Sequence, residues 1–196
     1  MVATLTRIFG VHNLALAEDV AVGVPAKEYG NGKSAVELAI EEFMLPVTTV
    51  LKSQFITARA AARHMVKQHS GVIIFLTGGP ARSHVQGTSA IGAAFGAIEA
   101  LTRNLALDVS PAGVRVVCVR SAAMPDTRTI QDTVDAMVGM MNISKDQAIA
   151  ALANLTLLKV SRSASDTAKA AAFLASDRAR MMTGTVLNSS GGAVAD

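Results

Sequence analysis

Two short, continuous apolar runs, at residues 71–77 and 114–119, limit the folds open to this chain. Strands buried on both faces of a sheet read as unbroken runs of Val, Ile and Leu, whereas strands with one wet face alternate. Between the runs, residues 88–110 are rich in Ala and Leu at helical spacing, and this segment ends at Pro111 and Gly113. A helix that joins two buried strands predicts an α/β fold, in which a parallel sheet carries helices on both faces.

The other elements are predicted from capping residues and proline positions. Ser34 and Glu37 have the spacing of a capping box, which predicts a short helix over residues 34–43. Pro46 suits the first turn of a long helix ending near residue 68, because the N–H that proline lacks would be unpaired there. Further elements are expected as helices at residues 126–141, 144–155 and 165–174, a last strand at 185–188, and a short strand near 4–11.

Length, charge and hydropathy limit the class of protein. A chain of 196 residues with 51% hydrophobic content can bury one sizeable core, so we expect a single domain over residues 1–196. The 18 basic and 15 acidic residues are scattered without a basic run, so no nucleic-acid partner is expected. The sequence has no apolar stretch as long as a membrane span and no secretory signal, which predicts a soluble, cytoplasmic protein with no membrane contact.

Histidine and cysteine usage gives no sign of a metal site. The four histidines, at positions 12, 64, 69 and 84, lack metal-ligand spacing, so no metal is expected. The single cysteine, Cys118, lies in an apolar run, where a buried and inert thiol is the natural interpretation. One cysteine also excludes a disulfide bond within the chain.

Three groups of segments carry a family resemblance, and they occur in the family's order. They are residues 55–61 with 71–74, residues 99–108 with 113–116, and residues 166–177 with 183–188, Gly191 and Gly192. Together they resemble the short-chain dehydrogenase/reductase family over a core of residues 46–192. The resemblance implies a three-layer, Rossmann-like parallel sheet with helices on both faces. Residues 1–45 would then be a divergent or remodelled segment, with the family's N-terminal strands reduced or missing.

The resemblance also places the family's catalytic Asn, Ser, Tyr and Lys on particular positions of this chain. They fall on Val50, Gly78, Ile91 and Phe95. None of these side chains can donate, accept or relay a proton, so the family mechanism is predicted to be lost and no catalytic residue is assigned. Ile91 and Phe95, one helical turn apart, are expected to fill the site with hydrocarbon.

The dinucleotide site implied by the family is incomplete as well. The family binds pyrophosphate on a Thr-Gly-x-x-x-Gly-x-Gly turn, and no such spacing precedes Pro46, where Gly23, Gly30 and Gly32 have other intervals. Thr127 is a partial match to the family's Thr that contacts the nicotinamide carboxamide. No cofactor is therefore expected, and the most favoured interpretation is a non-catalytic homologue that acts as an oligomer or as a partner-binding protein.

A second hypothesis keeps enzymatic function open. Thr77, Arg82, Ser83, His84 and Ser89 lie in or near the loop after the central strand, where ligands bind in open α/β folds. A Ser near a His has the elements of a nucleophile and a base, although this loop has no acidic residue to orient the His. The alternative is thus an NAD(P)-dependent oxidoreductase with a rewired active site and a small-molecule ligand.

For the first hypothesis, the partner is a second copy of the chain or an intact family member. In the family, helices equivalent to residues 46–68 and 88–110 pack against their symmetry mates, so we expect a homo-oligomer through these helices. The candidate stripe consists of Phe55, Arg59, Ala62, Val66, Leu101, Leu105 and Val109, part of which must face the chain's own sheet. Gly92, Gly96 and the alanines near them offer a second surface for close helix approach, either to a partner or within the chain.

Overall fold

The computed structural model describes residues 32–196, and its centre is a parallel sheet of three strands. In the described residues the strand order is β1 (Gly71–Gly78), β2 (Val114–Ser121), β3 (Thr185–Asn188), with Gly71 opposite Val114 and Val117 opposite Thr185. The three predicted strands and their parallel direction are confirmed. The strand expected near residues 4–11 lies outside the described residues.

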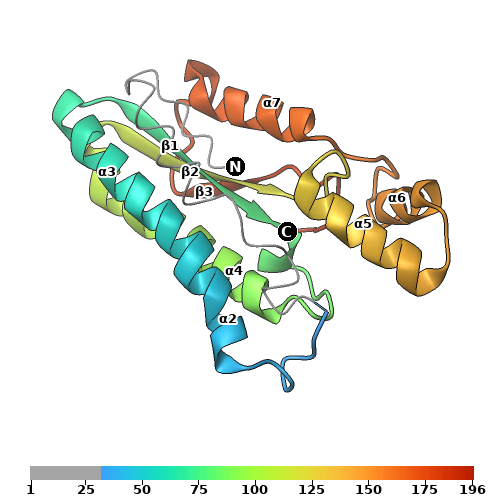
Figure 1. The fold of residues 1–196 in the computed structure, drawn as a ribbon. Helices are drawn as coiled ribbons and strands as arrows, with labels where there is room; N and C mark the ends of the chain where they lie inside the picture. Colours follow the sequence, from blue (N-terminus) through green and yellow to red (C-terminus); the bar gives the residue numbers. More distant parts are fainter. Residues whose placement is uncertain (1–31) are drawn as a thin grey trace.

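Helices cover both faces of this sheet, which makes the three predicted layers (Figure 1). Helices α3 (Lys52–Gln68) and α4 (Ser89–Val109) lie on one face, and α7 (Ala164–Ala175) lies on the other. Helices α5 (Arg128–Met141) and α6 (Lys145–Asn154) pack on each other beyond the carboxyl ends of the strands. The fold is therefore α/β with a Rossmann-like arrangement, reduced to three strands in the described part.

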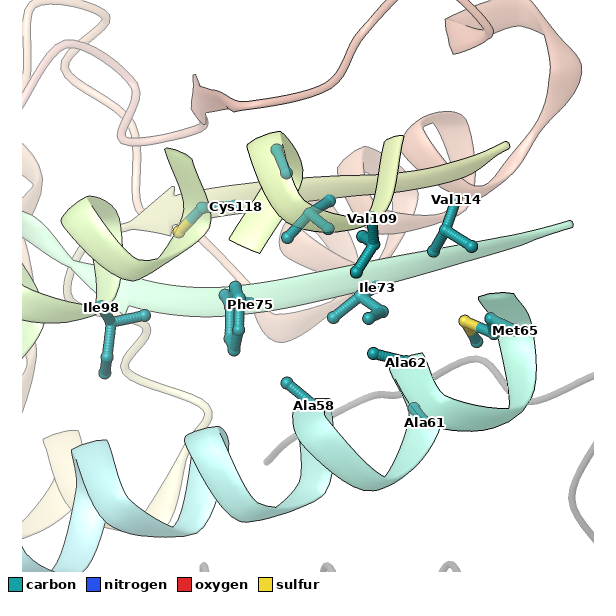
Figure 2. Packing of buried hydrophobic residues seen from close by; sticks show 12 residues of the cluster. Ala58, Ala61, Ala62, Met65, Ile73, Phe75, Ile98, Val109, Val114 and Cys118 are labelled. Carbon is teal, nitrogen blue, oxygen red and sulfur yellow. The ribbon is translucent and has the colours of Figure 1, made fainter. Parts of the chain in front are cut away.

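The core divides into two clusters because successive strand residues face opposite sides of the sheet. Ile73 and Phe75 of β1 point toward α3 and α4, where they meet Ala58, Met65 and Ile98 (Figure 2). The other cluster lies on the α7 side and contains Ile74, Val117, Val119, Ala171, Leu174 and Ala179. Burial on both faces explains why both strands read as continuous apolar runs.

The helix start predicted at Ser34 is wrong. Ser34 and Glu37 form only a turn, in which the Glu37 N–H donates to the Ser34 carbonyl at 2.9 Å. The helix, α2 (Ile40–Pro46), begins six residues later, where the Glu42 carboxylate accepts a hydrogen bond of 3.1 Å from the Ala39 N–H. Ala39 has no side-chain acceptor, so the observed start uses only the Glu42 half of a capping box.

The prediction that Pro46 opens the long helix is also wrong. Pro46 is the last residue of α2, and a π-helical turn (Val47–Leu51) joins it to α3. Proline removes one backbone donor from a helix interior and thereby favours a change in the hydrogen-bond ladder. The Thr49 hydroxyl donates to the Leu45 carbonyl at 2.6 Å, so a side chain supplies a donor at this irregular turn.

The later helices begin at the residues that cap them. Helix α6 starts after Ser144, whose hydroxyl accepts from the Gln147 N–H at 3.2 Å, as the capping box predicts. Helix α5 begins at Arg128 and not at residue 126, because Asp126 is used elsewhere and accepts hydrogen bonds from the Ala164 N–H. Across residues 32–196, no helix combines the length and apolar character needed to cross a membrane.

Candidate functional site

The carboxyl ends of the three strands meet at one edge of the sheet, where open α/β folds bind ligands. Strand β1 ends at Gly78, β2 at Ser121 and β3 at Asn188. The loop after β1 leads through a 3₁₀ turn (Gly79–Ala81) to the start of α4. Of the four positions implied by the family resemblance, Gly78 lies at the end of β1, and Ile91 and Phe95 lie near the start of α4. Val50 lies in the π-helical turn, which packs against α4.

Gly78 and Phe95 fit together closely. A Cβ atom added at Gly78 would lie 3.0 Å from Cε2 of the Phe95 ring, which is closer than ordinary carbon contacts. The ring is half-buried and packs against the core cluster of α3, α4 and the sheet. The aromatic ring therefore fills the space into which a side chain at position 78 would extend.

The remaining two positions are apolar as well. Ile91 is buried on α4, and Val50, in the π-helical turn, packs against the same core cluster as Phe95. Side chains at positions 50, 78, 91 and 95 thus present no hydrogen-bonding atom. They do not fit a group that needs a hydroxyl or an ammonium at these points, such as the ribose and nicotinamide of a dinucleotide.

A hollow of about 610 Å³ lies beside these positions, over the loop between β1 and α4. Ser83, His84 and Ser89, three of the loop residues named from the sequence, line it together with Pro80, Ala81, Val85, Gln86, Thr88 and Gly92. Within the described residues, the Ser83 hydroxyl and the His84 ring form no hydrogen bond with each other. The hollow therefore offers polar groups for binding, without an assembled nucleophile and base.

Two of the five loop candidates lie outside this hollow. Thr77 is buried in β1, where its hydroxyl donates to Oε1 of Glu99 at 3.3 Å. Arg82 is exposed, and its Nε lies 4.0 Å from Oδ1 of Asp196. The structure therefore brings together Ser83, His84 and Ser89 but separates Thr77 from them.

Thr127, the partial match to a cofactor-contacting residue, already forms a hydrogen bond within its own turn. It is half-buried immediately before α5, and its hydroxyl donates to the Met124 carbonyl at 2.7 Å. The hydroxyl can still accept a hydrogen bond, but its proton already has a partner.

A buried ion pair between α4 and β2 was not predicted from the sequence. The Arg120 guanidinium donates from Nε to Oε1 of Glu99 at 2.7 Å and from Nη2 to Oε2 at 3.0 Å. Only 3% and 6% of the two side chains are exposed, so this bidentate pair is shielded from solvent. The hydrogen bonds that Arg120 donates to Glu99 raise the pKa of Arg120 above its ordinary value. The signal that could have found this pair is that Glu99 and Arg120 each stand directly beside an apolar stretch, residues 97–98 with 100–101 and residues 116–119.

A second buried arginine connects two loops at the same edge. Arg162 donates from Nε to the Ala123 carbonyl at 3.0 Å and from Nη1 to the Ser190 carbonyl at 2.8 Å. Burial lowers the pKa of Arg162, because it disfavours the charged form. The arginine fixes the loop after β2 against the loop after β3, and so it shapes the edge where the hollow lies.

The interface stripe expected from the sequence is largely internal. Ala62 and Val109 are buried, and Val66, Leu101 and Leu105 pack against the core, so these five residues stabilise the chain's own fold. Of the seven residues, Phe55 and Arg59 are exposed. Gly92 contacts its own chain too, because a Cβ there would lie 2.8 Å from the Pro80 carbonyl oxygen, whereas Gly96 faces open space.

Comparison with known proteins agrees with this fold. Residues 9–194 match the family described as enoyl-(acyl carrier protein) reductase. Xanthoxin dehydrogenase of Arabidopsis thaliana is 29% identical over 94% of this chain and 62% of its own length. Short chain aldehyde dehydrogenase 1 of Euphorbia lathyris is 31% identical over 70% of this chain and 48% of its own length.

Solved structures show the same architecture. Sorbitol-6-phosphate 2-dehydrogenase of Erwinia amylovora superposes with a TM-score of 0.78 at 22% identity, covering 89% of this chain and 66% of that one. A structure described as NAD⁺-bound xylitol dehydrogenase gives a TM-score of 0.74 at 22% identity, covering 87% and 66%. The fold and the family match together identify the class as short-chain dehydrogenase/reductase proteins.

This chain belongs to the short-chain dehydrogenase/reductase family, with the match beginning upstream of residue 46. It spans about half to three fifths of the length of the curated relatives that it matches. The family resemblance in the sequence is thereby confirmed.

Proposed function

We propose that this chain is a family member that does not transfer hydride by the family's Tyr–Lys mechanism and acts instead as an oligomeric or partner-binding protein. The contact between Phe95 and Gly78 is the observation that supports this most directly. An aromatic ring in the space of a catalytic hydroxyl leaves no room for that hydroxyl. Loss of positioned acid and base groups removes about 10² to 10⁴ in rate.

The proposal extends to the cofactor. Ile91 and Phe95 place apolar side chains on the side of the site that would hold ribose and nicotinamide. An apolar surface cannot replace the hydrogen bonds that ribose and nicotinamide make with water. We therefore expect no saturable binding of NAD(P) by residues 32–196. Relatives and structural neighbours are named as dehydrogenases or reductases, and some are described with NADP or NAD⁺ bound, so this expectation separates the chain from them.

The outer surface of α3 and α4 supports the oligomer part of the proposal. Leu107 is 77% exposed on α4, and Phe55 and Ile56 are exposed on α3. Gly96 faces open space, which would allow close approach of another helix. Exposed apolar side chains beside a small-residue surface are features of a helix–helix interface, with a second copy or an intact family member as the partner.

Two measurements test this function together. Purified protein mixed with NADH or NADPH and a panel of aldehydes, ketones and enoyl thioesters is expected to leave absorbance at 340 nm unchanged. Light scattering is expected to give a mass above 20.2 kDa, the mass of one chain. Leu107→Arg should return that mass toward the monomer, whereas Leu157→Arg, at an equally exposed leucine after α6, should leave it unchanged.

A second candidate function rests on the hollow over the loop between β1 and α4. Ser83, His84 and Ser89 could bind a small molecule there, and an oxidoreductase with altered contacts would use them in place of the family's residues. This candidate predicts substrate-dependent oxidation of NADH or NADPH that falls at least tenfold in His84→Ala. No turnover at all would leave the first proposal standing, whereas turnover that is unchanged in that variant would contradict both functions.

A further inference from the structure

The carboxylate of Asp196 lies on a cluster of donors that come from three separate parts of the fold. Arg120, at the end of β2, donates to it from Nη1. Asn188, at the end of β3, donates from Nδ2 to Oδ2 at 3.0 Å. Arg82, in the loop after β1, approaches Oδ1 to 4.0 Å. Sites built from several strand ends are characteristic of ligand binding in α/β folds.

The most buried donor of this cluster is rigidly held. Arg120 is 3% exposed, and Glu99 takes its Nε and Nη2 donors in the bidentate pair described above. Only the Nη1 side of the guanidinium is directed toward Asp196. A planar guanidinium with one side fixed presents its remaining donor in a set direction, which favours an acceptor of carboxylate type.

The charges of the cluster favour an anion beside Arg120. Glu99, Arg120 and Arg82 together carry one net positive charge, and the Asp196 carboxylate neutralises it. The hydrogen bond from Arg120 is the main cause that holds the pKa of Asp196 below its ordinary value. The hydrogen bond from Asn188 and the positive charges of Arg120 and Arg82 lower this pKa further. Removing Asp196 would leave a buried guanidinium donor unpaired, which is unfavourable in a protein interior.

The segment that carries Asp196 is anchored before it reaches the cluster. Val194 is buried, and its N–H donates to the Ser190 hydroxyl at 3.2 Å. Beyond Val194, the described hydrogen bonds and ion pairs are those of the Asp196 side chain, which is 44% exposed. The carboxylate can therefore leave the cluster by a local movement that keeps Val194 in place.

We propose that the place held by the Asp196 carboxylate is a subsite for the carboxylate group of a small ligand, with Arg120 and Asn188 as its hydrogen-bond donors and Arg82 as a nearby positive charge. Val194, two residues before Asp196, and Ser83, which lines the hollow, both lie close to Gly79, since a Cβ there would lie 3.4 Å from Val194 and 3.7 Å from the Ser83 hydroxyl. Asp196 acts as an internal competitor that the ligand displaces. This inference does not depend on whether the chain turns over a dinucleotide.

Chemical rescue with acetate tests the subsite. Asp196→Ala removes the competitor and lowers the melting temperature; acetate at constant ionic strength is expected to restore it, with an affinity at least tenfold higher than for the wild-type protein. Chloride at the same ionic strength should not restore it. Asp108→Ala, at an exposed aspartate on α4, is the matched control and should respond to acetate as the wild type does.

A second variant separates this subsite from general anion effects. In Asp196→Ala, adding Arg82→Ala removes an exposed positive charge without disturbing the core, and acetate affinity should fall by about two- to fivefold. Inorganic phosphate should bind Asp196→Ala more weakly than acetate does, because the donors are arranged for two planar oxygens. Equal acetate affinity in Asp196→Ala and Asp108→Ala, no effect of Arg82→Ala, or tighter binding of phosphate would overturn the proposal.

Discussion

At the scale of single residues, the candidate site depends on two residues that fit against each other. Gly78 and Phe95 are neighbours in space although 17 positions separate them in sequence, and the ring is accommodated only because residue 78 has no side chain. The sequence identified both positions through the family resemblance. It could not reveal their contact, because the distance depends on how α4 packs over the end of β1.

The contact predicts a specific stability effect. Gly78→Ala should lower the free energy of unfolding by about 1–3 kcal/mol, because the new methyl group overpacks against the Phe95 ring. In a Phe95→Ala background the same change should cost much less. Gly139→Ala, on α5 where a Cβ meets open space, is the control and should gain up to about 1 kcal/mol. Urea denaturation measures all four variants, and additive effects of Gly78→Ala and Phe95→Ala would contradict the contact.

The single thiol gives a second test at this scale. Cys118 is fully buried, and burial raises its pKa to about 11, so thiolate is scarce at pH 8. The folded protein should therefore react with a thiol reagent such as DTNB at least a hundredfold more slowly than the protein in guanidinium chloride. Rapid labelling of the folded protein would show that Cys118 is accessible.

Asp196 predicts a pH dependence of stability. Its folded-state pKa is below the usual 3.8, so its contribution to stability is fully present above that value and is lost as pH falls through the lower pKa. The wild type should therefore melt at a higher temperature than Asp196→Asn at pH 6, and the difference should shrink below about pH 3.8. A difference that stays constant from pH 6 to pH 2.5 would exclude the contacts of Asp196 with Arg120 and Asn188.

At the scale of elements, most of the fold follows from local patterns. The apolar runs predicted β1 and β2, and the Ser144 capping box predicted the start of α6, because strands buried on both faces and capped helices have short-range signatures. The start of α2 and the π turn after Pro46 were missed. Both depend on a choice between competing local hydrogen bonds, which periodicity does not encode.

The buried ion pair between Glu99 on α4 and Arg120 on β2 gives a prediction at the scale of elements. Glu99→Gln leaves the buried Arg120 without its main counter-charge and should lower the free energy of unfolding by about 3–5 kcal/mol. Replacing both residues by apolar ones, in Glu99→Leu with Arg120→Met, should cost less than Glu99→Gln alone, because no charge is left buried. Guanidinium denaturation compares the two. A double variant less stable than Glu99→Gln would mean that the pair itself is strongly stabilising.

At the scale of the whole molecule, the family and the fold could be predicted from the sequence, whereas only part of the candidate site could be. The order of segments that resemble the short-chain dehydrogenase/reductase family pointed to that family, and the family match confirms it. Ser83, His84 and Ser89 could be grouped from the sequence because they follow a buried strand, and they line one hollow. The cluster of Arg120, Asn188 and Asp196 was not found, because its members come from distant segments that only the folded sheet brings together.

The binding of nicotinamide dinucleotides tests the central claim most directly. Isothermal titration of the full chain with NADH and with NADPH, each to millimolar concentration, should give no saturable heat, because the positions that would hold ribose and nicotinamide carry Ile91 and Phe95. Saturable binding of either dinucleotide that is abolished by Ser89→Arg, a change at the hollow beside those positions, would contradict the account.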